Sequence, residues 1–248
     1  MRTEEMAALG MAGAYDRAIT VFSPQGRLYQ VEYALETVKS GSTSVGIRVE
    51  EGVVLAVEER AHSRLQSPAY SQKLFQVDVH IGAAASGLIS DARVLVDSAR
   101  VYAQSYRLTY DEPPSVEGIA KRVGDLMQLY TQHGGVRPFG VALLIGGVSV
   151  DGARLFYTEP SGVVMEYQAW SIGRGADKVK EILESSYETN TSLEKAKALA
   201  ITALVKSVDK IDENWMARMI VIPADVKTYT TVPVEEVNKL VKDALQTK

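Results

Sequence analysis

The sequence predicts an α+β protein with two mostly antiparallel sheets that helices cover on both outer faces. Its 248 residues are 46% hydrophobic and 23% charged, a composition that can bury a sizeable core. Valine-rich runs that read as strands are grouped, and segments with apolar residues three and four positions apart, typical of helices, come mostly in pairs. Strands and helices alternate in a doubly wound parallel sheet, so this grouping favours two antiparallel sheets.

The first half of the chain begins with a turn and a helix. In the turn Ser23-Pro24-Gln25-Gly26, proline sets one corner and glycine permits the next. An apolar stripe at steps of three and four then predicts an N-terminal helix at about 24–40 that ends at Gly41. The elements expected next are strands at 43–49, 52–57, 74–77 and 79–85. They are followed by a helix from Leu88 that Asp111-Glu112-Pro113-Pro114 breaks and a helix from the N-cap Ser115 that ends at Gly134-Gly135.

The second half follows the same grouping. Strands are expected at 141–145, 154–158, 163–167 and 169–172, helices at 176–187 and 192–208, and two last strands at 216–222 and 228–232. Pro233 suits the first turn of a final helix. No linker or repeat divides the chain, so we expect a single domain over residues 14–248. Residues 1–13 are small and mixed, which predicts a flexible N-terminal tail.

Composition excludes several classes of function. The net charge of −4 disfavours a nucleic-acid partner. The absence of cysteine removes disulfides and cysteine chemistry, and three histidines without a metal-binding spacing predict no metal site. Gly173-Arg174-Gly175 lacks the third glycine of a dinucleotide fingerprint, so no cofactor is expected. The longest apolar run, Val141 to Val148, is too short to span a membrane, and the start lacks a signal peptide, which predicts a cytoplasmic protein.

A continuous motif carries a resemblance to a known family. The twenty residues from Tyr15 to Ala34, YDRAITVFSPQGRLYQVEYA, resemble the motif of α-type proteasome subunits, above all the archaeal form. The segments that also resemble this family are Gly41-Ser42-Thr43, Lys73-Leu74, Ser86-Gly87-Leu88, Asp91-Ala92-Arg93 and the run from Tyr130 to Gly140. The resemblance covers nearly the whole chain from about Gly13.

The resemblance implies a fold and a role. The fold is the four-layer αββα sandwich of the N-terminal-nucleophile hydrolases, which agrees with the order of elements predicted above. The role is that of a non-catalytic subunit of the 20S core particle, in a seven-membered ring that caps rings of β subunits. The β subunits hydrolyse unfolded proteins with an N-terminal threonine, while the α ring restricts entry and docks AAA+ ATPase activators.

Two other functions stay open. In the first, the chain is itself a self-processed peptidase, because Ser42 and Thr43 stand where β subunits carry their mature N-terminus, with Glu58 and Lys73 near the positions of the β acidic residue and lysine. That mechanism needs a freed α-amine as its base. The well-patterned helix before Ser42 suggests a retained segment instead, so we expect no catalytic residue here. In the second, the chain forms a structural ring without a proteolytic partner.

The resemblance also assigns site residues. Tyr15, Asp16, Pro24 and Tyr33 match the cluster that stabilises the gate, which we call the gate cluster; phenol and carboxylate groups of this kind can be linked by hydrogen bonds. The tail of residues 1–13 is then the gate itself.

A second set of residues matches the pocket that receives an activator. There Lys73 accepts the C-terminal carboxylate of a tail that ends hydrophobic-tyrosine-any residue. The wall of the pocket is Gly87 and Leu88, and its edge is Gly26 and Arg27. We call these five residues the docking set.

Overall fold

The computed structural model describes residues 20–61, 63, 65 and 71–246, so the tail and the gate residues Tyr15 and Asp16 lie outside the described residues. Two five-stranded sheets form the centre, and every strand pair is antiparallel. The first sheet has the order β10 (Thr230–Thr231), β9 (Trp215–Pro223), β2 (Gly52–Arg60), β1 (Ser44–Val49), β8 (Ala169–Ile172). The second has the order β3 (Leu74–Asp78), β4 (Ile81–Gly87), β5 (Val141–Ser149), β6 (Gly152–Thr158), β7 (Val164–Glu166).

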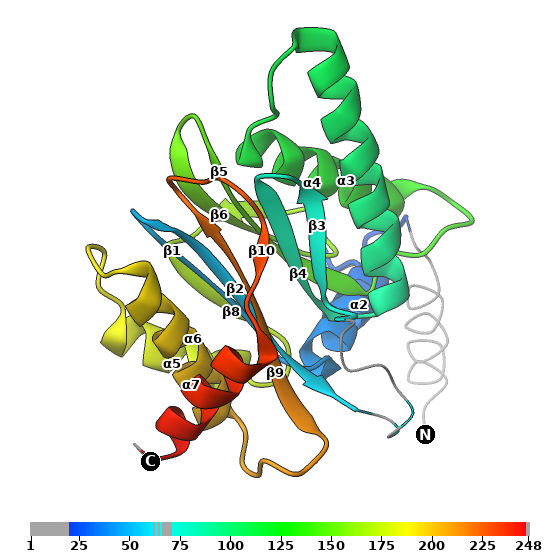
Figure 1. Cartoon of the computed structure of the whole chain (residues 1–248). Coiled ribbons are helices and arrows are strands. Elements are labelled where there is room, and N and C mark those ends of the chain that lie inside the picture. Colours follow the sequence, from blue (N-terminus) through cyan, green and yellow to red (C-terminus); the bar gives the residue numbers. More distant parts are fainter. Residues whose placement is uncertain (1–19, 62, 64, 66–70, 247–248) are drawn as a thin grey trace, which may run out of the picture.

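Helices cover both outer faces (Figure 1). The first sheet packs against α5 (Ala176–Ser186), α6 (Leu193–Ser207) and α7 (Val234–Gln246), and the second against α3 (Ile89–Tyr110) and α4 (Val116–Gln132). Three apolar cores result, one under each helical layer and one between the sheets. The predicted fold, an α+β sandwich of two antiparallel sheets between helical layers, is confirmed.

The strand β5 shows why its sequence does not alternate. All nine of its residues are buried. Leu143 and Ile145 join the core under α3 and α4, whereas Ala142 and Leu144 join the core between the sheets. Successive side chains of a strand point to opposite faces, and here both faces are covered, so the strand is apolar throughout. For the same reason it runs four residues beyond the predicted end at 145.

Two predicted boundaries were wrong. The N-terminal helix, α2 (Tyr29–Ser40), does not begin near residue 24, because Ser23 and Gly26 form a closed turn in which the Gly26 amide donates to the Ser23 carbonyl at 2.8 Å. Helix α3 ends where the sequence predicts a break, at Asp111, which has a left-handed φ of 54°. The last strand, expected at 228–232, is paired only over Thr230–Thr231.

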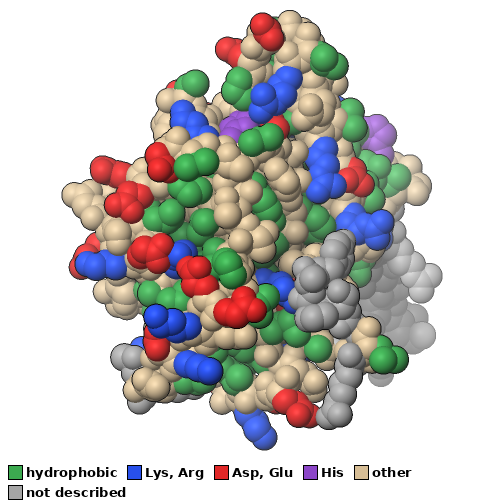
Figure 2. Space-filling view, in the orientation of Figure 1, with side chains coloured by type: hydrophobic (Ala, Val, Ile, Leu, Met, Phe, Trp, Pro, Cys, Tyr) green, Lys and Arg blue, Asp and Glu red, His purple; other side chains and the backbone are tan. Residues whose placement is uncertain are grey.

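Helix α2 closes one end of the sandwich. Its buried residues are Val31, Ala34 and Val38, and the helix contacts β4 and β5. Val38 belongs to the core between the two sheets. On the face seen in Figure 2, acidic and basic side chains are interspersed, as the small net charge leads one to expect. No helix among the described residues is long and apolar enough to cross a membrane.

Candidate functional site

The segment before Ser42 is built into the fold. Beyond α2, the Gly41 carbonyl accepts a hydrogen bond from the Arg174 amide at 2.8 Å. A Cβ atom at Gly41 would lie 2.4 Å from the Gly87 amide nitrogen, so only glycine allows this backbone approach. Gly87 has a φ of 109°, and a Cβ there would lie 2.3 Å from the Gly140 carbonyl oxygen. The chain that precedes Ser42 is therefore locked against three other segments.

Lys73 points into this junction rather than toward solvent. Its side chain is buried, and the ammonium donates to the carbonyl oxygens of Ser42 at 2.7 Å, Thr43 at 3.1 Å and Glu58 at 3.1 Å. It also lies 2.9 Å from the Ser42 hydroxyl oxygen. Burial lowers the pKa of Lys73 to about 7, although the charges of Glu58 and Glu59 oppose the shift.

The Glu58 carboxylate completes a cluster of serine, lysine and glutamate. It is 1% exposed, accepts the Thr43 amide at 3.2 Å and pairs with Arg174 at 3.2 Å. The Ser42 hydroxyl donates to the Glu58 carbonyl at 3.0 Å. These residue types match those of an N-terminal nucleophile site, but the nitrogen of Ser42 is held in a peptide bond with Gly41. While that bond is intact, Ser42 has no free amine to take up a proton.

The described part of the gate cluster lies at the chain start. Pro24 is exposed in the turn before α2. Tyr33 is 48% exposed, and its ring stacks on that of Tyr29 with centroids 6.5 Å apart. Both residues are therefore on the surface of the described structure. Their predicted contacts with Tyr15 and Asp16 fall outside the described residues.

The docking set divides into two groups. Lys73, Gly87 and Leu88 lie beside the C-terminal end of α2, where Gly87 contacts Gly41. Gly26 and Arg27 lie before its N-terminal end, where Arg27 pairs with Glu32. A helix of 12 residues is about 18 Å long. Within one copy of the chain, the two groups of the docking set therefore lie at opposite ends of α2.

The sequence is similar to known proteins over most of its length. The proteasome subunit family matches residues 38–222, and the N-terminal signature of A-type proteasome subunits matches residues 15–36. This chain belongs to the proteasome subunit family. It is 52% identical to the proteasome alpha subunit of Methanocaldococcus jannaschii over 92% of this chain and 87% of that protein. It is 48% identical to that of Methanothermobacter thermautotrophicus over 97% and 96%, and 54% identical to that of Methanopyrus kandleri over 82% of each.

The predicted family is thereby confirmed, and so is its α type. The matched signature at 15–36 spans the motif from Tyr15 to Ala34 that carried the resemblance. The relatives come from archaea, as the motif indicated. Among the described residues, no group of three or more histidine, aspartate or glutamate side chains is placed to hold a metal ion.

Sequence reasoning missed the ion pair that holds Gly140 in this member of the family. Asp91 accepts two hydrogen bonds from Arg137, at 2.6 and 2.8 Å, and one from the Gly140 amide at 2.9 Å. Burial favours a higher pKa for Asp91, but the bonds from Arg137 and Gly140 outweigh it and hold the pKa below its usual value. Both residues stood in segments that resembled the family, but only their pairing reveals that they fix the backbone on which Gly87 rests.

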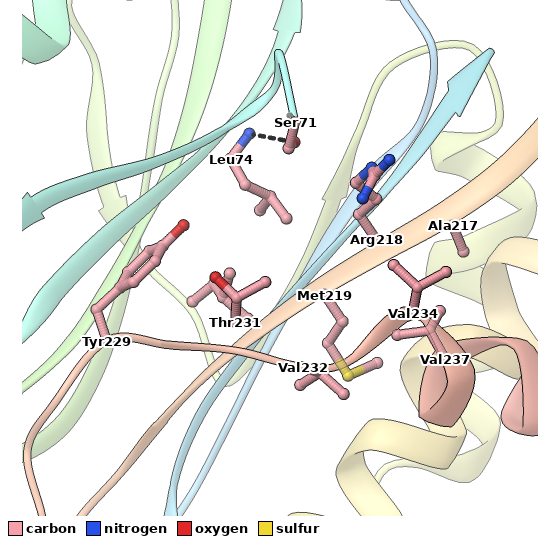
Figure 3. Close-up of a pocket in the computed structure, with 11 residues that line it drawn as sticks. Ser71, Leu74, Ala217, Arg218, Met219, Tyr229, Thr231, Val232, Val234 and Val237 are labelled. Carbon is pink, nitrogen blue, oxygen red and sulfur yellow. Dashed lines mark hydrogen bonds between the residues drawn. The ribbon is translucent and has the colours of Figure 1, made fainter. Parts of the chain in front are cut away.

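A cavity of about 200 Å³ opens between β3 and the strands β9 and β10 (Figure 3). Leu74, Met219 and Val237 contribute apolar wall, and Arg218 and Tyr229 bring polar groups from different sides of the cavity. Arg218 pairs with Glu59 at 3.1 Å. The other carboxylate oxygen of Glu59 accepts the backbone amides of Gln72 and Lys73. Glu59 thus fixes the start of β3, from which the Lys73 side chain turns inward.

Proposed function

We propose that this chain is a non-catalytic α subunit of a 20S proteasome core, which assembles into a seven-membered ring, stacks on rings of β subunits and works in the cytoplasm on unfolded protein substrates. One observation carries the proposal: α2 and Gly41, directly before Ser42, form part of the packed structure. A discarded propeptide has no reason to supply buried residues to the core between the sheets, as Val38 does.

Sedimentation tests the assembly. The purified chain alone should sediment as a ring, and the chain mixed with a proteasome β subunit should sediment as a larger stacked particle that hydrolyses peptides. A ring that ignores the β subunit would favour the structural ring without a proteolytic partner. The intact mass of the chain in the active particle should still include residues 1–41. A mature terminus at Ser42 or Thr43 would favour the self-processed peptidase.

In this function the residues before the described part act as a gate. Several such segments that meet near a ring axis obstruct a pore, and ordering them away from it costs roughly 1–2 kcal/mol per residue in backbone entropy. Deletion of Met1 to Ala12 should therefore accelerate hydrolysis of long peptides by the assembled particle, while short peptides are less affected. An unchanged rate for long peptides would exclude gating by this segment.

The docking set receives the C-terminal tail of an activator ATPase, which ends hydrophobic-tyrosine-any residue. The division of the set between the two ends of α2 supports a pocket formed by two neighbouring copies of the chain. Lys73 already donates to three carbonyls, so a carboxylate must compete for its ammonium. Leu88, 40% exposed, contributes to the rim.

A peptide with such a tail tests the docking pocket. It should stimulate the particle, and Leu88→Asp should abolish the stimulation. Leu129→Asp is a control of similar exposure, because Leu129 is 41% exposed and lies on α4, which supplies none of the five residues. Lys73→Ala should also remove the stimulation while a particle without residues 1–12 keeps its basal hydrolysis. Equal stimulation of the wild type and Leu88→Asp would contradict the assignment.

A further inference from the structure

A second hollow lies at the opposite end of the second sheet from Lys73 and Gly87. The β3–β4 turn, the β5–β6 turn, the loop between β9 and β10 and the link between α3 and α4 meet there, and we call this region the hairpin end. Two hydrogen bonds hold it together, from the Tyr229 amide to the Val79 carbonyl at 2.7 Å and from the Val148 amide to the His80 carbonyl at 3.1 Å. The hollow has a volume of about 180 Å³, and its lining residues include His80, Arg107, Ser149 and Lys227.

The rim of this hollow is apolar and exposed. Val79 and Val150, each in a hairpin turn, are 52% and 88% exposed. Leu108 and Tyr110, at the end of α3 that projects beyond the strands in Figure 1, are 89% and 62% exposed. Figure 2 shows acidic, basic, histidine and apolar side chains together over the upper end of the molecule. Large apolar side chains gathered around a hollow mark a surface for a protein partner.

Among the residues that line the hollow, positive charges outnumber negative ones, while the adjoining link between α3 and α4 carries Asp111 and Glu112. Arg107 pairs with the buried Asp78 at 2.9 Å, so these two charges cancel. His80 donates from Nε2 to the Pro114 carbonyl at 2.9 Å, and its Nδ1 lies 3.5 Å from the Arg107 guanidinium and 3.6 Å from the Asp78 carboxylate. Lys227 forms no ion pair within the part of the chain that the structure describes. Asp151 and Asp225 belong to the same loops but do not line the hollow.

One buried polar atom at this hollow lacks a partner. The hydroxyl oxygen of Ser149 is buried and makes no hydrogen bond to any described residue. Ser149 is 8% exposed. Buried hydroxyl groups nearly always have a partner, and leaving one without costs free energy. In the cavity of Figure 3, by contrast, Arg218 is already paired with Glu59. The hairpin end therefore offers a hydrogen-bond donor and a cation to a group that the chain itself does not supply.

We infer that this hollow receives a carboxylate side chain from the β subunit on which the ring is stacked, with Lys227 and the Ser149 hydroxyl as its donors. This inference rests on the proposed function. Lys73, Gly87 and Leu88, the activator side, lie at one end of β3 and β4, and the hairpin end lies at the other. If the first end faces the activator, the second faces the adjoining ring. The exposed valines around the hollow then cover apolar side chains that flank the acid of the partner.

The test is stacking of the full chain on its cognate proteasome β subunit. Lys227→Glu reverses the charge, and Lys227→Met removes it. We expect Lys227→Glu to weaken the association at least about tenfold and Lys227→Met to weaken it less. Lys195→Glu, an exposed lysine on α6, is the matched control and should associate like the wild type. All variants should still form the ring alone.

The outcomes separate this inference from the proposed function. If the wild type does not bind the β subunit, the proposed function fails and the inference with it. If the wild type binds and Lys227→Glu binds equally well, the inference alone fails. If Lys227→Glu loses the ring in the absence of the β subunit, the hairpin end is a contact between copies of this chain and the inference also fails.

Ser149→Ala gives a second and independent readout. It removes a hydroxyl that has no partner in the free chain, so the melting temperature of the ring should stay the same or rise. The same substitution should weaken β-subunit binding about fivefold, because the carboxylate loses a donor. Unchanged binding, or a loss of stability and binding together, would contradict the role of this hydroxyl.

Discussion

The two ends of the second sheet differ in how completely they are closed. At the Gly87 end, backbone lies against backbone, and the Lys73 ammonium donates to three carbonyls. At the hairpin end, Val79 and Val150 are exposed and the Ser149 hydroxyl is unpartnered. The first end contains the residue types of a hydrolase site yet satisfies them internally. The comparison shows that the residue types of a hydrolase do not by themselves make a hydrolase site, and that a buried polar group without a partner points to a group that the chain does not supply.

The largest expected loss of stability is for a substitution at the Gly87 end. Gly87→Ala would place a Cβ 2.3 Å from the Gly140 carbonyl oxygen at a φ of 109°, so it should cost about 3 kcal/mol or more in unfolding free energy. Gly152→Ala is the matched control at the hairpin end, with a φ of 91° and nothing within 4 Å of the added atom. It should cost about 1 kcal/mol from the backbone alone. Chemical denaturation measures both, and similar losses would refute the contrast between the ends.

Removal of the Lys73 ammonium should lower the unfolding free energy by less than Gly87→Ala does. Each carbonyl that it contacts keeps a second donor: the Ser86 hydroxyl for Ser42, the Glu58 amide for Thr43 and the Ser42 hydroxyl for Glu58. Lys73→Met therefore strands none of these acceptors and should cost about 2 kcal/mol at pH 7. A loss above about 5 kcal/mol would mean that the ammonium alone holds the junction together.

The difference in unfolding free energy between the wild type and Lys73→Met should depend on pH. Burial lowers the pKa of Lys73 from its ordinary 10.5 to about 7. Between these pH values the unfolded chain binds one more proton at this site than the folded chain, so the stability of the wild type should rise with pH relative to Lys73→Met. The relative gain approaches about 1.4 kcal/mol per pH unit well above pH 7 and disappears as the pH falls below 7. Denaturation of both proteins at several pH values measures it, and parallel profiles would show that Lys73 remains charged.

The smallest change in stability is expected for a substitution at the rim of the hairpin end. Val150→Ser should change the stability of the free ring by less than about 0.5 kcal/mol, because the side chain is 88% exposed. Val38→Ser, at 5% exposure in the core between the sheets, is the matched substitution and should cost about 3 kcal/mol. Comparable losses from both in thermal unfolding would show that the hairpin end is not an open surface.

Periodicity predicted the fold because nearly every element buries an apolar stripe. The spacing of Val31 and Val38 placed α2, and Ser115 marked the start of α4, where its hydroxyl accepts the Gly118 amide at 3.0 Å. Boundaries failed where local geometry decides them, as at the turn before Tyr29.

The site was predicted less completely, because its features depend on contacts between distant segments. Ser42, Glu58 and Lys73 were predicted to share one frame, and the structure brings them together. A single lysine at the start of a strand gives no sign that its ammonium is buried. Likewise, no pattern along the chain reveals that Gly41, Gly87 and Gly140 converge, or that Ser149 has no partner.

The contact between Gly87 and Gly140 limits how sequences of this kind can diverge. Residue 87 has no room for any side chain, whereas position 150 borders open space. After gene duplication, two copies can therefore drift apart at the hairpin turns and acquire different neighbours, while the architecture that they inherit stays the same.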